Sequence, residues 1–240
     1  MCGESEAMRF LFLTLAASAL ASAPAQATQP TRNYSVQSFD RIRLDGPYKV
    51  RLVTGVAPFA RASGATAALD SVAITVQGRT LIISRNRSTW GGYPGQPVGA
   101  VEIQVGTHEL GTAWLNGAGS LAIDRVRGLS FDLSVQGAGA ASIARVEVDQ
   151  LKVGLAGAGS ATLAGRAPKM TALVRGASLL DASALMVKDV TLGAEGPAIV
   201  KLNAVSSANI QIAGTASVEI IGNPACTIKA TGSATVSGCR

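Results

Sequence analysis

A repeat in the second half of this 240-residue sequence limits what the chain can fold into. Its three strongest copies are Leu115-Asn-Gly-Ala-Gly-Ser-Leu-Ala-Ile, Val135-Gln-Gly-Ala-Gly-Ala-Ala-Ser-Ile and Leu155-Ala-Gly-Ala-Gly-Ser-Ala-Thr-Leu. Weaker copies follow at spacings of 18 to 20 residues, which gives the anchor glycines Gly117, Gly137, Gly157, Gly176, Gly196, Gly214 and Gly232. A steady period of this length is typical of stacked structural repeats.

Within each repeat, apolar and polar residues alternate, which is the pattern of a β-strand. Residues 131–136 read Phe-Asp-Leu-Ser-Val-Gln, and a second short segment with Leu121 and Ile123 on one phase follows the glycine. Glycine permits a positive φ at a corner between two strands. The sequence therefore predicts an all-β fold, a parallel β-solenoid (β-helix) of 18–20-residue coils with a narrow core of small apolar side chains.

The coil register also predicts which side chains become neighbours. The anchor glycines should form one column, with neighbours about 4.8 Å apart. Arg175 should face Glu195, because both directly precede an anchor glycine. Lys201 should lie between Asp181 and Glu219, which occupy the same position in the adjacent coils. Opposite charges in such positions stabilise a sheet modestly.

A calcium-binding β-roll is a similar-looking alternative, since its consensus is also rich in glycine. Its acidic ligand position is occupied here by Ser120, Ala140 or Ser160, and calcium requires carboxylate or carbonyl oxygens. We therefore expect no calcium site, and we expect no other metal or cofactor.

The domain organisation follows from these patterns. Residues 28–33 are expected to form a linker, 34–110 an N-terminal antiparallel β region that caps the solenoid, and 111–240 the solenoid. A cap would prevent edge-to-edge association at the open end. The strands expected in the cap region are 42–44, 50–52, 72–76, 81–84 and 101–105.

Two segments outside the repeats carry a resemblance to a known family. They are Phe39-Asp-Arg-Ile-Arg-Leu-Asp-Gly-Pro-Tyr-Lys-Val-Arg-Leu and Gly78-Arg-Thr-Leu-Ile-Ile. Together with the Gly-x-Gly-Ser-type repeats, they resemble the putative auto-transporter adhesin, head GIN domain family over about residues 34–238. The resemblance implies an exported, β-rich protein, and it implies no catalytic residues.

The N-terminus predicts a secretory signal peptide over residues 1–27. Arg9 precedes the apolar run 10–21, and Ala25-Gln-Ala provides a cleavage site after Ala27. Either Met1 or Met8 is the start. We expect export to the periplasm or the cell exterior, and no transmembrane segment, because no later apolar run is long enough to cross a bilayer.

Export and charge narrow the classes of partner. Removing residues 1–27 takes away one of 21 basic and two of 15 acidic residues, so the mature chain carries 20 and 13, a net charge of +7. The basic residues are scattered, and an exported protein does not meet nucleic acid, so nucleic acid is not an expected partner. The expected partners are therefore envelope glycans or another protein.

Two of the three cysteines lie beyond the signal peptide, Cys226 and Cys239. An even number of cysteines in an oxidising compartment predicts a disulfide. The alternative is two free thiols, one buried and one in a frayed end.

Catalytic patterns are weak. His108 is the single histidine of the sequence, and no nucleophile elbow, phosphate loop or His-Glu-x-x-His motif occurs. Glu147 and Asp149 would share a face, which leaves a polysaccharide-active lyase or hydrolase as the alternative function. The remaining aspartates fall at different distances from their anchor glycines. We expect no enzyme.

Three aromatic residues are candidate ligand contacts. Trp90 and Tyr93 lie in a glycine-rich loop, and Trp114 lies on the outward phase just before Gly117. Aromatic rings of this kind stack on sugars or on protein partners. The alternative is that all three pack over the cap. We expect a non-catalytic protein in adhesion, envelope-associated binding or a structural role.

Overall fold

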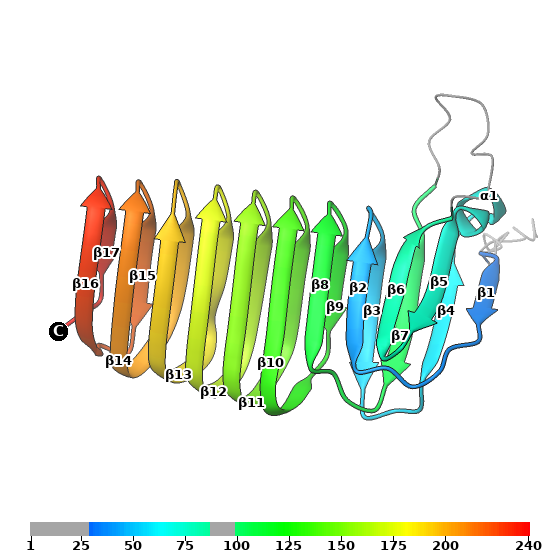
Figure 1. Cartoon of the computed structure of the whole chain (residues 1–240), viewed down its shortest axis with the longest axis horizontal. Helices are drawn as coiled ribbons and strands as arrows, with labels where there is room; N and C mark the ends of the chain where they lie inside the picture. Colours follow the sequence, from blue (N-terminus) through cyan, green and yellow to red (C-terminus); the bar gives the residue numbers. More distant parts are fainter. Residues whose placement is uncertain (1–28, 87–98) are drawn as a thin grey trace, which may run out of the picture.

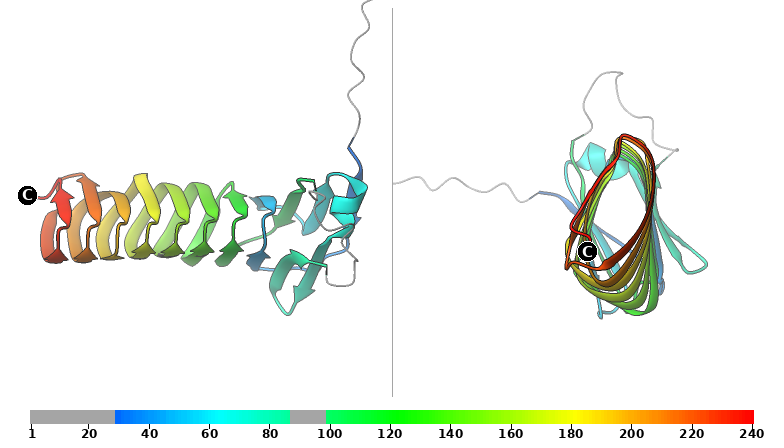
Figure 2. Two further views of the ribbon diagram at one scale, coloured as in Figure 1. Left: turned by 90° about the horizontal axis from the view of Figure 1, so that it is seen from above. Right: turned by 90° about the vertical axis from the view of Figure 1, so that its left-hand side faces the viewer.

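The computed structural model of the chain describes residues 29–86 and 99–240. Its strands form a long row of stacked coils, with the N-terminal region at one end and the C-terminus at the other (Figure 1). Viewed along the row, the coils enclose a flattened oval (Figure 2). The predicted parallel β-solenoid is confirmed. Within the described ranges, the single helix is α1 (Thr66–Asp70).

Each coil has one strand before its glycine corner and one strand after it, and these form the two opposite walls of the oval. Longer strands bend round and serve as the second strand of one coil and the first strand of the next. Every pairing between adjacent coils is parallel. The coil strands are β2 (Arg41–Asp45), β3 (Lys49–Thr54), β8 (Thr112–Gly117), β9 (Ser120–Ile123), β10 (Val126–Gly137), β11 (Ala140–Gly157), β12 (Ser160–Gly176), β13 (Leu179–Glu195), β14 (Ile199–Gly214), β15 (Ser217–Ile221), β16 (Ala225–Gly232) and β17 (Thr235–Ser237).

The anchor glycines form the predicted column. Gly117 lies opposite Gly137, and Gly157 lies between Gly137 and Gly176. All seven anchor glycines have φ between 82° and 110°, a range that side chains disfavour. A Cβ added to Gly157 would lie 2.8 Å from the carbonyl oxygen of Gly137, so the corner requires glycine for space as well. Gly46, with φ 130°, lies beside Gly117 and extends the column by one corner.

The side chains two residues before each corner point inward and form a continuous core. They lie opposite one another in successive coils, and six of the seven are at most 3% exposed. The exception is Ala230, which is exposed because no further described coil covers it. The column consists of Leu115, Val135, Leu155, Val174, Ala194, Ile212 and Ala230.

The N-terminal region contains the antiparallel strands that the sequence predicted. The outer strand β1 (Thr31–Tyr34) pairs with β4 (Phe59–Ser63), and β4 pairs with β7 (Glu102–Thr107). A hairpin is formed by β5 (Val72–Gln77) and β6 (Thr80–Arg85). All five strands expected in this region are present.

Strands β2 and β3 differ from the other strands of this region, because they form a solenoid coil. They pair in parallel with β8 and β9 on one side and with β6 and β7 on the other. Parallel stacking therefore begins inside residues 34–110. The reason is that Ile42 and Leu44 point inward and Gly46 turns the corner, as in every later coil. The chain leaves this coil after Thr54 and returns to the row at Thr112.

Three elements were missed in the sequence. Residues 31–33, expected to lie in a linker, belong to β1, and neither β4 nor α1 was expected. The residues of β1 are mostly exposed and show no apolar alternation. Their strand conformation comes from backbone pairing with β4, which has no local signal in β1 itself.

The predicted disulfide between Cys226 and Cys239 is confirmed. The two Cα atoms lie 5.7 Å apart, and Cys239 follows Cys226 by 13 positions in the sequence. The bond joins the start of β16 to the residues after β17, and so it closes the last described coil. In that coil Ile228, which is in register with the buried Ile210, is 43% exposed.

Candidate binding surfaces

Trp114 lies on the outer face of the wall formed by the first strands of the coils. Its strand neighbours in register are Arg43 and Ser134, and its side chain is half-buried. A hollow of about 430 Å³ opens beside it, at the junction of the coils and the β5–β6 hairpin. The hollow is lined by Arg43, Gln77, Thr80, Ile82, Trp114, Asn116 and Gln136.

Polar side chains around this hollow are held in defined positions. Nε of Arg43 lies 2.9 Å from Oδ2 of Asp45, and Nδ2 of Asn116 donates to Oδ1 of Asp45 at 2.6 Å. One carboxylate therefore fixes both a guanidinium and an amide beside the indole ring of Trp114. An aromatic face with fixed polar groups around it is the chemistry that recognises a sugar or a polar peptide.

Two of the three aromatic residues singled out in the sequence, Trp90 and Tyr93, lie outside the described residues. Their role as ligand contacts stays a prediction. Trp114 is the described member of the set, and it lies on the outward phase, as the alternation predicted.

A second hollow lies on the opposite wall. It is a groove of about 620 Å³ that crosses five neighbouring strands in the order β7, β3, β9, β11 and β12. Its part over the repeats is lined by the small side chains of Ser120, Ala122, Ser142, Ala144 and Thr162. These small residues recur at the same distance from successive anchor glycines, a regularity present in the sequence, although the groove itself was not predicted.

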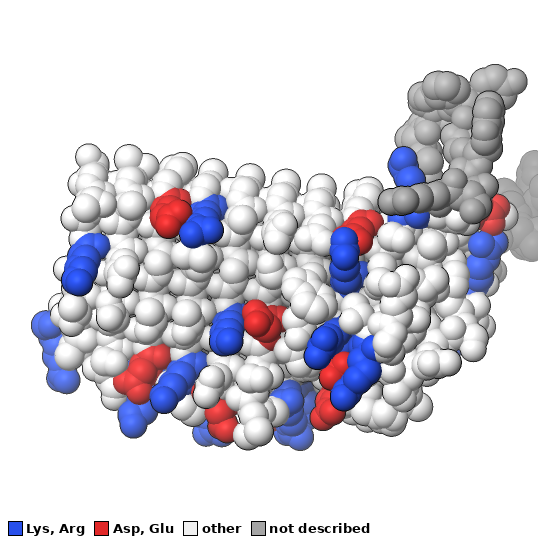
Figure 3. Space-filling model, viewed as in Figure 1, with Lys and Arg blue, Asp and Glu red and all other residues white. Residues whose placement is uncertain are grey.

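Charged side chains on the coils are arranged in pairs of opposite sign. Arg175 faces Glu195 with Nε and Oε2 3.0 Å apart, and Nζ of Lys201 lies 3.3 Å from Oε2 of Glu219. Asp181 is the other neighbour of Lys201, so the predicted three-residue ladder is confirmed. On the face seen in Figure 3, positive and negative side chains are interspersed, with the positive ones more numerous.

The two carboxylates that favoured an enzyme share an outward face, since both flank the buried Val148. Glu147 accepts a hydrogen bond from Nε of Arg127. This contact, together with the charges of Arg127, Arg145 and Arg125, lowers the pKa of Glu147. A carboxyl group with a lowered pKa is a poor proton donor at neutral pH, which disfavours the role of general acid in glycoside cleavage.

Within residues 29–86 and 99–240, no group of three or more His, Cys, Asp or Glu side chains is placed to hold a metal ion. The only described helix, α1, is far too short to cross a membrane.

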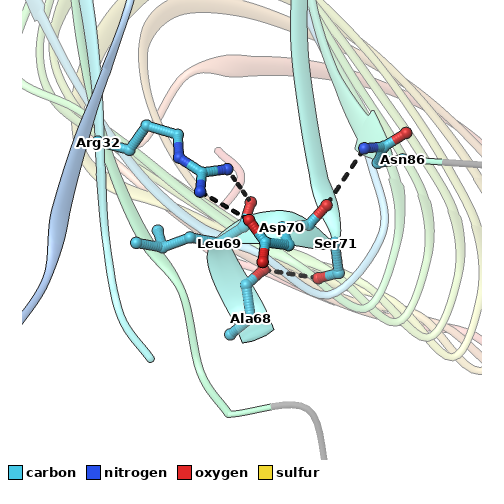
Figure 4. Close-up of polar contacts among 6 residues, drawn as sticks. All are labelled: Arg32, Ala68, Leu69, Asp70, Ser71 and Asn86. Atoms are coloured by element: carbon cyan, nitrogen blue, oxygen red, sulfur yellow. Dashed lines mark hydrogen bonds and ion pairs between the residues drawn. The ribbon is translucent and has the colours of Figure 1, made fainter. Parts of the chain in front are cut away.

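A polar cluster at the N-terminal end has a structural role. Nη2 of Arg32 lies 2.6 Å from Oδ1 of Asp70, and Nη1 of Arg32 donates to the carbonyl oxygen of Leu69 at 3.3 Å (Figure 4). Ser71 and Asn86 donate to carbonyl oxygens of the same helix, at Ala68 and Asp70. The hydrogen bond to Asp70 raises the pKa of Arg32. These contacts fasten α1 between β1 and the end of β6.

The sequence matches the model of one known protein family. The model of the family described as "Putative auto-transporter adhesin, head GIN domain" matches residues 38–224. No curated protein sequence matches the chain significantly.

Several solved structures share the fold. A putative adhesin from Bacteroides fragilis superposes with a TM-score of 0.78 at 20% identity, covering 89% of this chain and 97% of that one. A putative lipid binding protein from Parabacteroides distasonis gives 0.69 at 16% identity, covering 88% and 96%. A putative adhesin from Parabacteroides merdae gives 0.69 at 15% identity, with the same coverage. At these identities the likeness establishes the fold alone.

Proposed function

Because the chain belongs to the putative auto-transporter adhesin, head GIN domain family, we propose that it is an exported, non-catalytic binding protein that acts in adhesion or in organising the cell envelope. The family and its structural relatives suggest adhesion or binding. The disulfide between Cys226 and Cys239 supports an exported protein, because disulfides persist in oxidising compartments.

The observation that carries this proposal is the hollow beside Trp114. An indole ring lies half-buried among amide, hydroxyl and guanidinium groups on the outer face of this wall. Such a ring offers a large apolar contact at low conformational cost, while the surrounding groups fix the orientation of a ligand. An envelope glycan or a polar segment of a partner protein has the matching chemistry.

A binding screen of the exported chain against glycans and envelope proteins tests the proposal. The wild-type protein should bind at least one ligand, and Trp114→Ala should weaken that binding by about tenfold or more, as expected for an aromatic anchor. Trp114→Phe keeps an aromatic ring and should retain part of the affinity. Thr171→Ala, an exposed position on the same wall, is the matched control and should bind as the wild type does.

The same screen also tests the alternative function, a polysaccharide-active lyase or hydrolase. Shortened or unsaturated products from a bound polysaccharide would favour it. Loss of that activity in Glu147→Gln, with folding unchanged, would assign the activity to the pair of Glu147 and Asp149. Absence of products together with ligand binding supports the non-catalytic function.

Localisation has a separate test. We propose that the signal peptide 1–27 is removed and that the mature protein begins at Thr28, in the periplasm or outside the cell. These residues lie outside the described ranges. Mass spectrometry of the protein from cell fractions should give a mature N-terminus at Thr28, whereas an intact N-terminus at Met1 or Met8 would contradict cleavage.

A further inference from the structure

The coils follow a consistent rule for charge. Eight pairs of charged residues lie opposite each other in register on neighbouring described strands, and in all eight the charges are of opposite sign. Like charges in such positions destabilise a sheet. The pairs are Arg127 with Glu147, Glu147 with Arg166, Asp132 with Lys152, Lys169 with Asp189, Arg175 with Glu195, Asp181 with Lys201, Lys201 with Glu219, and Lys49 with Glu102.

Arg125 and Arg145 break this rule. They directly precede Val126 and Val146, which lie opposite each other in β10 and β11, so the two arginines occupy the same position in adjacent coils. Both line one hollow of about 250 Å³, together with Asp124 and Ala144. Neither guanidinium forms an ion pair with a described residue.

The acidic groups near this hollow are already engaged. Oδ1 of Asp124 accepts the backbone N–H groups of Thr54, at 3.0 Å, and of Arg125, at 2.6 Å. Glu147 is held by Arg127, as described above. Arg125 and Arg145 thus line a hollow where an additional negative group would be favourable.

The hollow adjoins the groove on the second wall, because Asp124 and Ala144 line both. The groove crosses five strands and is therefore about 20 Å long, since neighbouring strands lie about 4.8 Å apart. Arg51 lies in it with Gln104 and Ala122 as its register neighbours, and so it has no acidic partner in the sheet. Counting Lys49, Arg51, Arg125 and Arg145 against Glu102 and Asp124 gives the groove and hollow a net charge of +2.

We propose that this groove binds a linear acidic polysaccharide, with a carboxylate or sulfate group held between Arg125 and Arg145. A groove that is open, long and lined by small side chains admits an extended polymer. Arg51, Arg125 and Arg145, which have no acidic register partner, supply positive charge along this path. The inference extends the proposed binding function to a second wall, and it does not depend on Trp114.

The test uses matched pairs of probes on the full exported chain. Tetramers of galacturonic acid and of sulfated galactose are compared with their neutral counterparts, the methyl ester and the unsulfated tetramer, by isothermal titration calorimetry. At least one acidic tetramer should bind, and its neutral counterpart should bind at least about tenfold more weakly, because each hydrogen bond to a charged group carries that order of affinity. Equal binding of acidic and neutral tetramers, or no binding of either acidic tetramer, would overturn the proposal.

Variants then locate the site. The double variant Arg125→Gln/Arg145→Gln should lose at least about tenfold in affinity for the acidic tetramer. Arg175→Gln, which removes an arginine paired with Glu195 on the opposite wall, should leave that affinity unchanged. Unchanged binding by the double variant would overturn the proposal. If Trp114→Ala keeps its affinity for the acidic tetramer, the groove is a site separate from the Trp114 hollow and stands even if the Trp114 proposal fails.

Two further measurements test whether Arg145 has a structural role and whether the anion is a lipid headgroup. Without ligand, Arg145→Gln should change the melting temperature little, since it removes both the like-charged neighbour of Arg125 and a charge that attracts Glu147. A large fall in the melting temperature would mean that Arg145 is a structural contact and would contradict an open anion site. Vesicles with and without phosphatidylglycerol test lipid headgroups as the source of the anion. Binding to the anionic vesicles without binding to either acidic tetramer would overturn the polysaccharide assignment.

Discussion

Arg175 and Glu195 lie side by side in adjacent coils, with Nε of the arginine 3.0 Å from Oε2 of the glutamate. Their side chains are 55% and 54% exposed, so water screens the attraction. A double-mutant cycle with Arg175→Ala and Glu195→Ala should give a coupling free energy of about 0.2–1 kcal/mol, and the coupling should fall with added salt. A coupling of several kcal/mol would contradict this picture of a screened surface pair.

Gly157→Val should destabilise the protein strongly. The residue has φ 110°, and a Cβ there would lie 2.8 Å from the carbonyl oxygen of Gly137. Backbone strain and crowding together should lower the free energy of unfolding by at least about 2 kcal/mol, as measured by denaturant titration. Thr162→Val, at an exposed position of the next strand segment, is the control and should change it by about 0.5 kcal/mol or less. Equal effects would mean that the corner tolerates side chains.

Removal of the disulfide should affect stability through the unfolded chain. Replacing Cys226 and Cys239 by serine frees a loop closed by residues 13 apart and should cost about 3 kcal/mol by the loop-entropy relation. Reductant should lower the melting temperature of the wild type and leave that of the double serine variant unchanged. If reductant shifts both proteins equally, the effect does not come from this bond.

Asp181 should contribute stability that is lost in acid. Oδ1 of Asp181 accepts hydrogen bonds from the hydroxyl group of Ser183 at 2.6 Å and from its backbone N–H at 3.1 Å. These contacts, with the charge of Lys201, lower the pKa of Asp181 below its ordinary value of 3.8. Because the folded-state pKa lies below the unfolded-state pKa, the contribution is complete above the unfolded value and disappears as the pH falls through the folded one.

The measurement is the free energy of unfolding of wild type and Asp181→Asn as a function of pH. The variant should be less stable at pH 7, and the difference should shrink as the pH falls below 3.8. Ser183→Ala should reduce the pH-dependent part, because it removes the hydroxyl donor. A difference that grows on acidification would reverse the assigned direction of the pKa shift.

The repeats could be predicted from sequence because their neighbours are set by a local period. A spacing of 20 residues places Arg175 against Glu195, and the even number of cysteines after residue 27 predicted the disulfide. The coil formed by β2 and β3 was not predicted, because Gly117 follows Gly46 by 71 positions, far outside the 18–20-residue spacing of the later corners.

The sequence predicted only parts of the two candidate binding surfaces: the outward position of Trp114 in the first, and the repeat strands that carry the second. Trp114 was recognised as outward-facing, but its hollow also needs Gln77 and Thr80 from a hairpin whose position depends on long-range pairing. Arg125 and Arg145 both lie eight residues after an anchor glycine, so their stacking was readable in the sequence. The groove beside these two arginines could not be predicted from the sequence, because its shape depends on how β7 and β3 pack beside the coils.

The interrupted first coil has a consequence for the order of folding. Strands β2 and β3 are synthesised early, yet β8 and β9, which cover one side of them, emerge about 70 residues later. Closing a connection of that length costs about 1 kcal/mol more than closing a 20-residue one, whereas each later coil adds to a neighbour about 20 residues away. Folding is therefore expected to begin among the later coils, whose contacts are local, and the coil of β2 and β3 is expected to join them at the greater entropic cost.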